Sequence, residues 1–216
     1  EPEGADAGFA AVWKINLGRG QTFERVRSWE GFHGEWQAAL ALPGRGFVLS
    51  GNWMTPKPEQ ARHSWVMRFD ALDEPRWDQV FFGGGDNVLE LHRTPSGTVI
   101  GAGQHNIGPP ERSRARWLEL DPDGRKLRSP TMDPPDADSY TVANALAFHD
   151  DGVVVVGSVR PDGGLKDGFI GSTTWSGTQL LPHIELGGVG KDRFFDIVRT
   201  SAGWVVVGQT ATSDEK

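Results

Sequence analysis

The stretch Gly152-Val153-Val154-Val155-Val156-Gly157 recurs in altered form at three other places in this chain. The related segments are Gly46-Phe47-Val48-Leu49-Ser50-Gly51, Gly97-Thr98-Val99-Ile100-Gly101 and Gly203-Trp204-Val205-Val206-Val207-Gly208. Their first glycines are 51, 55 and 51 residues apart. Short apolar runs bounded by glycine are typical of buried strands. A period near fifty residues that contains only strand patterns predicts a β-propeller.

A second series of aromatic residues follows nearly the same period. Trp13, Trp65, Trp117 and Phe169 are each 52 residues apart, and each begins an apolar strand pattern. Their recurrence at one place in the repeat predicts that they pack between neighbouring sheets rather than bind a ligand.

Each repeat divides into four predicted strands, and the second repeat shows them most clearly. Its strands are expected at 87–94, 98–104, 114–120 and 125–132. Asp121-Pro122-Asp123-Gly124 predicts a tight turn between the last two strands. A segment with helical periodicity is absent from the sequence, so we expect an all-β fold.

The repeat is interrupted at the two ends of the chain. Residues 9–17 and 21–29 match the third and fourth strands of a repeat, whereas 193–200 and 203–210 match the first and second strands. Pairing of these halves predicts a composite closing sheet and a closed ring of four blades. The alternative is that the chain is part of a larger propeller.

Composition narrows the compartments and partners that we expect. The 216 residues carry a formal charge of −7, which argues against nucleic acid or an anionic membrane as the main partner. Without cysteine there is no disulfide and no thiolate chemistry. No apolar run is long enough to span a membrane, so membrane insertion is not expected.

Residues 1–8 are expected to be a flexible leader, 9–212 a single propeller domain and 213–216 a tail.

The repeats resemble those of bacterial β-propeller proteins with a Gly-Gly-x-x-Asp start, a Gly-x-Val-Val-x-Gly strand and a Trp-x-x-x-Asp-x-x-Gly strand and turn. The matching segments are Gly83-Gly84-Gly85-Asp86, Trp65-Val66-Met67-Arg68-Phe69-Asp70, Trp117-Leu118-Glu119-Leu120-Asp121-Pro122-Asp123-Gly124 and Gly187-Gly188-Val189-Gly190-Lys191-Asp192. The third repeat departs from this pattern with Asp138-Ser139-Tyr140-Thr141 at its start. The resemblance implies an extracytoplasmic protein, periplasmic, surface-bound or secreted, without a known activity.

Three acidic residues precede the first strands of their repeats at equivalent positions. Glu35, Asp86 and Asp192, with Thr141 in the third repeat, would lie at one rim of a central channel. Converging carboxylates repel one another unless a cation neutralises them, and Ca²⁺ prefers such oxygen ligands. The sequence therefore predicts these three acids as candidate metal ligands. The alternative is that each acid accepts backbone N–H bonds from its own turn or from the next blade and so fixes the spacing of the blades.

The loops between second and third strands carry cationic and aromatic residues. On a propeller they share one face with the loops that connect successive blades, and binding residues are often found on such loops. The candidate partner-binding residues are Trp53, Lys57, Arg62, His63, His105, Arg112, Arg160 and Lys166.

These features predict a non-enzymatic binding or interaction module that presents its loop face to a protein or glycan partner. No catalytic residue and no cofactor other than the channel cation is expected. The alternative function is a glycan-cleaving hydrolase that uses carboxylates at the channel rim, which Asp136, Asp138 and Glu185 could join. A third hypothesis is a domain of a larger surface assembly.

Overall fold

The computed structural model describes residues 9–16, 22–30, 34–44, 46–54, 62–81, 86–106, 112–132, 140–161, 164–187 and 190–211. Within these ranges the chain is all-β, as predicted, and every strand pairing is antiparallel. The predicted leader at 1–8 and the tail at 213–216 lie outside the described residues.

Three four-stranded sheets are flanked by two hairpins. The N-terminal hairpin is β1–β2, the first sheet is β3–β6, the second is β7–β10, the third is β11–β14 and the C-terminal hairpin is β15–β16. The strands are β1 (Phe9–Asn16), β2 (Thr22–Glu30), β3 (Gly34–Ala41), β4 (Phe47–Met54), β5 (Arg62–Phe69), β6 (Pro75–Phe81), β7 (Asn87–Arg93), β8 (Val99–Asn106), β9 (Ser113–Leu120), β10 (Lys126–Arg128), β11 (Tyr140–His149), β12 (Gly152–Arg160), β13 (Asp167–Thr174), β14 (Gln179–Leu186), β15 (Arg193–Thr200) and β16 (Gly203–Gln209). The described residues thus form three four-stranded sheets and two two-stranded hairpins.

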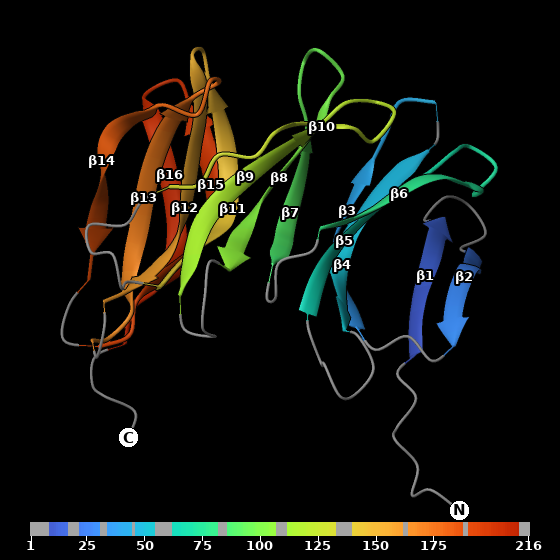
Figure 1. Cartoon of the computed structure of the whole chain (residues 1–216), viewed down its shortest axis with the longest axis horizontal. Coiled ribbons are helices and arrows are strands. Elements are labelled where there is room, and N and C mark those ends of the chain that lie inside the picture. The colour runs from blue at the N-terminus through green and yellow to red at the C-terminus, as the bar shows by residue number, and fades with distance from the viewer. Residues whose placement is uncertain are drawn as a thin grey trace, which may run out of the picture.

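The first, second and third sheets follow the N-terminal hairpin across the view in the order of the chain, and the C-terminal hairpin overlaps the third sheet in this view (Figure 1). Each sheet packs through its first strand: β7 contacts β3, β11 contacts β7, and β15 contacts β11. Every sheet therefore has a preceding face, toward the sheet before it in the chain, and a following face, toward the sheet after it.

The composite closing sheet is not formed, so the four-bladed ring is not confirmed. The N-terminal and C-terminal hairpins are separate two-stranded sheets. Val12 of β1 packs against Leu49, Met67 and Phe69 of the first sheet, and β15 packs against the third sheet. Each hairpin thus buries apolar surface against the sheet nearest in sequence, which costs less loop-closure entropy than a contact between the chain's two ends.

A β-bulge opposite a glycine recurs in the three four-stranded sheets and in the C-terminal hairpin. In each of them it lies where the first strand pairs with the second. The bulges lie between Trp36 and Ala38, Val88 and Glu90, Ala143 and Ala145, and Phe194 and Asp196. The facing glycines are Gly51, Gly103, Gly157 and Gly208. A Cβ atom on any of them would lie less than 3.0 Å from a carbonyl oxygen of the first strand. Only glycine therefore allows the bulged backbone to approach this closely.

Apolar side chains fill the spaces between successive sheets. Val48 and Val66 pack with Val88 and Leu118 between the first and second sheets. Ile100 and Trp117 pack with Val153, Val155 and Phe169 between the second and third. Between the third sheet and the C-terminal hairpin, Val154 and Val156 pack with Ile197 and Val206. Adjacent residues of a strand therefore point to opposite faces of the sheet, because side chains alternate with a period of two residues.

The equal spacing of Trp65, Trp117 and Phe169 does not place them on the same face. Trp65 pairs with Gly51 and Phe169 with Gly157, whereas Trp117 pairs with Ala102, one residue short of Gly103. A slip of one residue turns a side chain to the other face. Trp65 and Phe169 consequently face the preceding sheet, and Trp117 faces the following one. In the second sheet the residue paired with the glycine is Arg116, which lies opposite Gly103. It holds the position that Trp65 and Phe169 hold in the first and third sheets.

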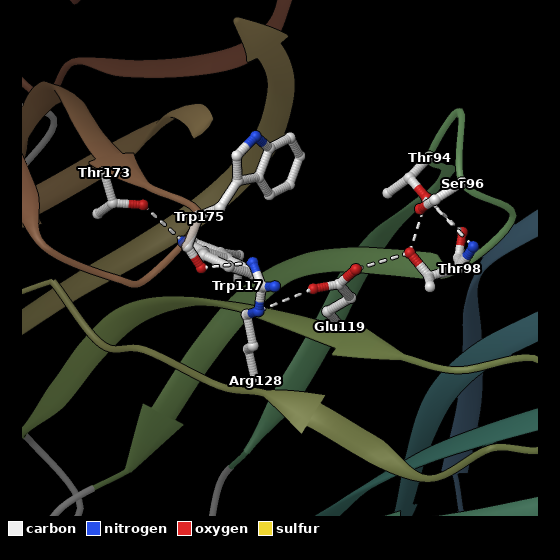
Figure 2. Close-up of polar contacts among 8 residues, drawn as sticks. All are labelled: Thr94, Ser96, Thr98, Trp117, Glu119, Arg128, Thr173 and Trp175. Atoms are coloured by element: carbon white, nitrogen blue, oxygen red, sulfur yellow. Dashed lines mark hydrogen bonds and ion pairs between the residues drawn. The ribbon is translucent and has the colours of Figure 1, made fainter. Parts of the chain in front are cut away.

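Polar contacts link the second and third sheets at the end that carries the turns (Figure 2). The Trp117 Nε1 donates to Thr173 Oγ1 at 2.8 Å, and Arg128 Nη1 donates to the Trp175 carbonyl oxygen at 2.7 Å. Glu119 lies between Arg128 Nε, at 3.4 Å, and the Thr98 hydroxyl, at 2.7 Å. Because its carboxylate is held by neighbours on both sides, we assign this network to the fold and not to a ligand site.

The predicted Asp121–Gly124 turn is confirmed. Gly124 has φ of +83° and donates its backbone N–H to the Asp121 carbonyl at 3.0 Å, while Asp121 Oδ1 accepts from Asp123 N and Arg125 N. Trp77 Nε1 of the first sheet donates to Pro122 O at 2.9 Å. The aspartate therefore caps its own turn, and the turn also joins two sheets.

Candidate functional site: a basic pocket beside Tyr140

The acids predicted as metal ligands have different environments. Glu35 Oε1 accepts a hydrogen bond from Asn52 of its own sheet at 3.3 Å, and Asp192 is buried at the start of the C-terminal hairpin. Thr141 links two sheets, since its Oγ1 accepts from the Ala115 N–H of the second sheet at 2.7 Å. Among the described residues no group of three histidine or acidic side chains is placed to hold a metal ion. The structure therefore does not bring Glu35, Asp86 and Asp192 together.

Asp86 is neutralised by neighbours within its own sheet. Its Oδ1 lies 2.9 Å from His105 Nδ1 and accepts the Asn106 N–H at 3.0 Å, and its Oδ2 lies 3.1 Å from Arg116 Nη1. Asp86 is 2% exposed, and the Arg116 guanidinium lies over the Phe81 ring. Burial lowers the pKa of Arg116, and the charge of Asp86 opposes this shift. These partners of Asp86 lie on β8 and β9 of its own sheet, so they differ from the predicted alternative of bonds to its own turn or to the next blade.

The predicted partner-binding residues fall into separate groups. The Trp53 and His63 rings lie 5.7 Å apart at the loop end of the first sheet, and Arg112 is exposed before β9. His105 belongs to the Asp86 cluster. Lys57 lies outside the described residues, and for Arg62 the structure describes the backbone in β5 but not the side chain. Of the predicted residues whose side chains the structure describes, Arg160 and Lys166 line a common hollow.

Arg160 and Lys166 lie against the same ring. The Arg160 guanidinium carbon is 5.6 Å from the centre of the Tyr140 ring, and the Lys166 Nζ is 5.8 Å from it. Both distances are those of cation–π contacts. The Tyr140 hydroxyl donates to Gln104 Oε1 of the second sheet at 2.9 Å, which fixes the ring between the two sheets. Tyr140 is the one tyrosine in the sequence.

A pocket of about 420 Å³ opens beside this cluster, between the loop that joins β12 to β13 and the start of the C-terminal hairpin. Its lining residues are Arg160, Gly164, Leu165, Lys166, Lys191, Asp192, Arg193 and Gln209. Arg193 Nη2 donates to Gln209 Oε1 at 3.4 Å, and its guanidinium lies 4.5 Å from the centre of the Phe195 ring. The backbone N–H of Asp192 donates to the Lys166 carbonyl, so the loop and the hairpin are joined at the pocket wall.

The four cations of the pocket outnumber its one carboxylate. Burial lowers the pKa of Lys166, and the charges of Arg160, Arg193 and Lys191 lower it further. On the neighbouring wall, burial raises the pKa of Asp167, and the charges of Glu185 and Asp192 add to this shift. Crowded cations of this kind are relieved by a bound anion, which makes the pocket a candidate anion site.

Sequence reasoning missed Tyr140, Lys191, Arg193 and Gln209. The Lys191-Asp192-Arg193 stretch could have indicated the site, because two cations flank an acid there. Asp192 itself was predicted only as a metal ligand at the channel rim. Their proximity to Arg160 depends on how the C-terminal hairpin packs on the third sheet, which no local pattern contains.

Comparisons with known proteins add no family. Neither the models of known protein families nor the curated proteins contain a match to this chain. No repeat family is therefore identified. The described ranges also contain no helix long and apolar enough to cross a membrane.

Proposed function

We propose that this protein is a non-enzymatic binding module that recognises an anionic group displayed by a protein or a glycan. The observation that carries this proposal is the pocket beside Tyr140, in which Arg160, Lys166, Lys191 and Arg193 converge on a chain of net charge −7. The charged groups of Arg160 and Lys166 lie over the Tyr140 ring, and that of Arg193 lies over the Phe195 ring. Carboxylate, sulfate and phosphate groups accept such charge-assisted hydrogen bonds.

We further propose that the scaffold is of the propeller type. The four bulges opposite glycine support it, because they give each sheet the same close approach of its first two strands. In this scheme the three four-stranded sheets are blades, and the two hairpins are the complementary halves of another blade.

The first test is binding of two acidic ligands, oligogalacturonate and a glutamate-rich peptide, by isothermal titration calorimetry. We expect at least one of them to bind, and we expect the Arg160→Ala, Lys166→Ala double variant to bind roughly a hundredfold more weakly, since two charge-assisted hydrogen bonds are lost. The matched control is Arg125→Ala with Lys126→Ala, which removes the same charge from the exposed turn before β10. Equal loss of affinity in both double variants would show a general charge effect and contradict the pocket.

The pH dependence of that binding gives a second prediction. The lowered pKa of Lys166 means that its ammonium loses a proton at a lower pH than an ordinary lysine. Anion binding favours the charged ammonium, so affinity is fully present below this pKa and falls as the pH rises through it. Titrations in buffers of different ionisation enthalpy should show proton uptake on binding at alkaline pH. The Lys166→Arg variant, which stays charged, should not show it.

A second candidate function is glycan hydrolysis, favoured by the raised pKa of Asp167 beside Glu185 and Asp192. Glycosidases pair a carboxyl group of raised pKa with a second carboxylate. This function predicts release of reducing ends from oligogalacturonate by the wild-type chain and its loss in Asp167→Asn. A wild-type chain that binds the oligosaccharide without cleaving it supports the binding module.

A further inference from the structure

The C-terminal hairpin leaves apolar surface uncovered at a place where the other sheets bury it. Trp204 and Val206 face the third sheet, so Val205 and Val207 point to the following face, and Val198 is the cross-strand partner of Val205. These three valines are 56% (Val198), 49% (Val205) and 53% (Val207) exposed. The residues 51 positions earlier, Val154 and Val156, are 8% and 0% exposed because the hairpin covers them. The following face of the hairpin therefore has the composition of a buried sheet face.

The same hairpin has an unpaired edge. In the three complete sheets the second strand pairs with a third, as β4 does with β5, β8 with β9 and β12 with β13. Within the described residues β16 pairs only with β15. Its outer edge exposes a row of backbone donors and acceptors that can pair with another strand.

A hollow of about 520 Å³ marks the place where a third strand is missing. It is lined by Ile170, Leu180 and Ile184 of the third sheet and by Ile197, Trp204 and Val206 of the hairpin. Leu180 is 45% and Ile184 47% exposed. Between the second and third sheets the corresponding space is filled by Phe169, which the third strand β13 supplies and which is fully buried.

Strand β1 carries the pattern that this space requires. Trp13 precedes Phe169 by 156 residues, three times the spacing of 52. By sequence spacing the two-stranded N-terminal hairpin corresponds to the third and fourth strands of a repeat, and the two-stranded C-terminal hairpin corresponds to the first and second. The two hairpins are complementary, and they pack on different sheets: β1 contacts β3 of the first sheet, and β15 contacts β11 of the third.

We propose that two copies of this chain pair head to tail, so that the C-terminal hairpin of each docks against the N-terminal hairpin of the other. Strand β1 of the second copy pairs with the outer edge of β16, which places Trp13 opposite Gly208, at the register position that Phe169 holds opposite Gly157 in the third sheet. Each N-terminal hairpin keeps its contact with its own first sheet through Val12. The interface repeats the sheet-to-sheet packing already present three times within one chain. A two-fold dimer satisfies both junctions at once and pairs the outer edge of β16 in each copy.

The register of β12 with β13 predicts the residues that meet across the junction. Val156 pairs with Ile170, and their counterparts are Val207 and Lys14. Because the chain has no cysteine, one can be placed at each position without competing thiols. A mixture of the Lys14→Cys and Val207→Cys variants should form a disulfide-linked pair under mild oxidation, whereas neither variant alone should. The Lys14→Cys, Val207→Cys double variant should give linked dimers.

Light scattering of the whole chain provides the second measurement. We expect a mass twice the 23.6 kDa of one chain, and we expect Val205→Asp with Val207→Asp to weaken dimerisation roughly a hundredfold or more, because unpaired carboxylates would be buried. Leu72→Asp, at a turn residue 80% exposed, is the matched control and should remain dimeric. A monomeric wild type, open assemblies of higher mass, or a disulfide confined to one chain of the double variant would each overturn the proposal. The last result would show that the chain's own N-terminal hairpin occupies the face.

Discussion

Replacing Arg116 by leucine is expected to lower the free energy of unfolding by about 3–5 kcal/mol, the range for removal of one partner of a buried ion pair. Arg116 is 5% exposed, and its Nη1 lies 3.1 Å from an Asp86 carboxylate that is itself 2% exposed. Leucine would leave this carboxylate with His105 and the Asn106 N–H, without its guanidinium partner. The cost is therefore that of a buried charge whose neutralisation has been removed.

Urea denaturation followed by tryptophan fluorescence measures this change. Arg76→Leu serves as the control, because the Arg76 side chain of the Arg76–Asp70 pair is 64% exposed, and its loss should cost at most about 1 kcal/mol. The Asp86→Asn, Arg116→Phe double variant should recover much of the stability, since it removes both charges and restores the aromatic residue found at this position in the first and third sheets. A loss in Arg116→Leu no larger than in Arg76→Leu would contradict the role of the pair.

Substitution of Gly157 by alanine is expected to destabilise the third sheet by about 3 kcal/mol, at the upper end of the costs of overpacking a core. An added Cβ would meet the Val142 carbonyl oxygen at less than 3.0 Å and would also approach Asn144 N. Both groups belong to backbone held by the β11–β12 pairing, so relief requires movement of the bulge between Ala143 and Ala145. The atoms that obstruct the added Cβ belong to the backbone, so no change of side-chain rotamer can make room for it.

Gly164→Ala is the matched control for this variant. Its nearest neighbours would be side-chain atoms of Pro161 at 3.3 Å and beyond, so the change in the unfolding free energy should be small. Thermal unfolding monitored by circular dichroism compares the two. The same loss is expected for Gly103→Ala in the second sheet, and equal stability of Gly157→Ala and the wild type would refute the bulge–glycine requirement.

Strand positions could be predicted closely because they depend on local alternation and turn chemistry. The observed β7, β8 and β9 begin and end within two residues of the predicted strands at 87–94, 98–104 and 114–120. The fourth strand is shorter than 125–132, because Pro130 lacks a backbone donor and pairing resumes only as an isolated bridge between Arg116 and Thr131. The spacing of 52 residues did not show which face of its sheet each aromatic residue points to. At Trp117 the pairing is shifted by one residue, and the ring points to the other face.

The candidate site was predictable only in part. Arg160 and Lys166 were identified because cations on a loop of a rigid scaffold are candidates for binding. Tyr140, Lys191 and Arg193 were missed, because their contact with those cations joins segments that lie on different sheets. Trp53, His105 and Arg112, chosen by the same argument, lie in other places and do not share the pocket.

The amino-acid sequence by itself determined the all-β class and the positions of most strands and turns, because alternation, glycine and turn residues act over a few positions. Only the tertiary structure decided which neighbours meet: that Arg116 neutralises Asp86, that four cations surround one pocket, and that the hairpins at the two ends lie apart. The physical reason is that sheet-to-sheet packing depends on which face each residue serves and on the free energy of contacts between distant segments. Neither quantity is expressed in the local pattern of residues.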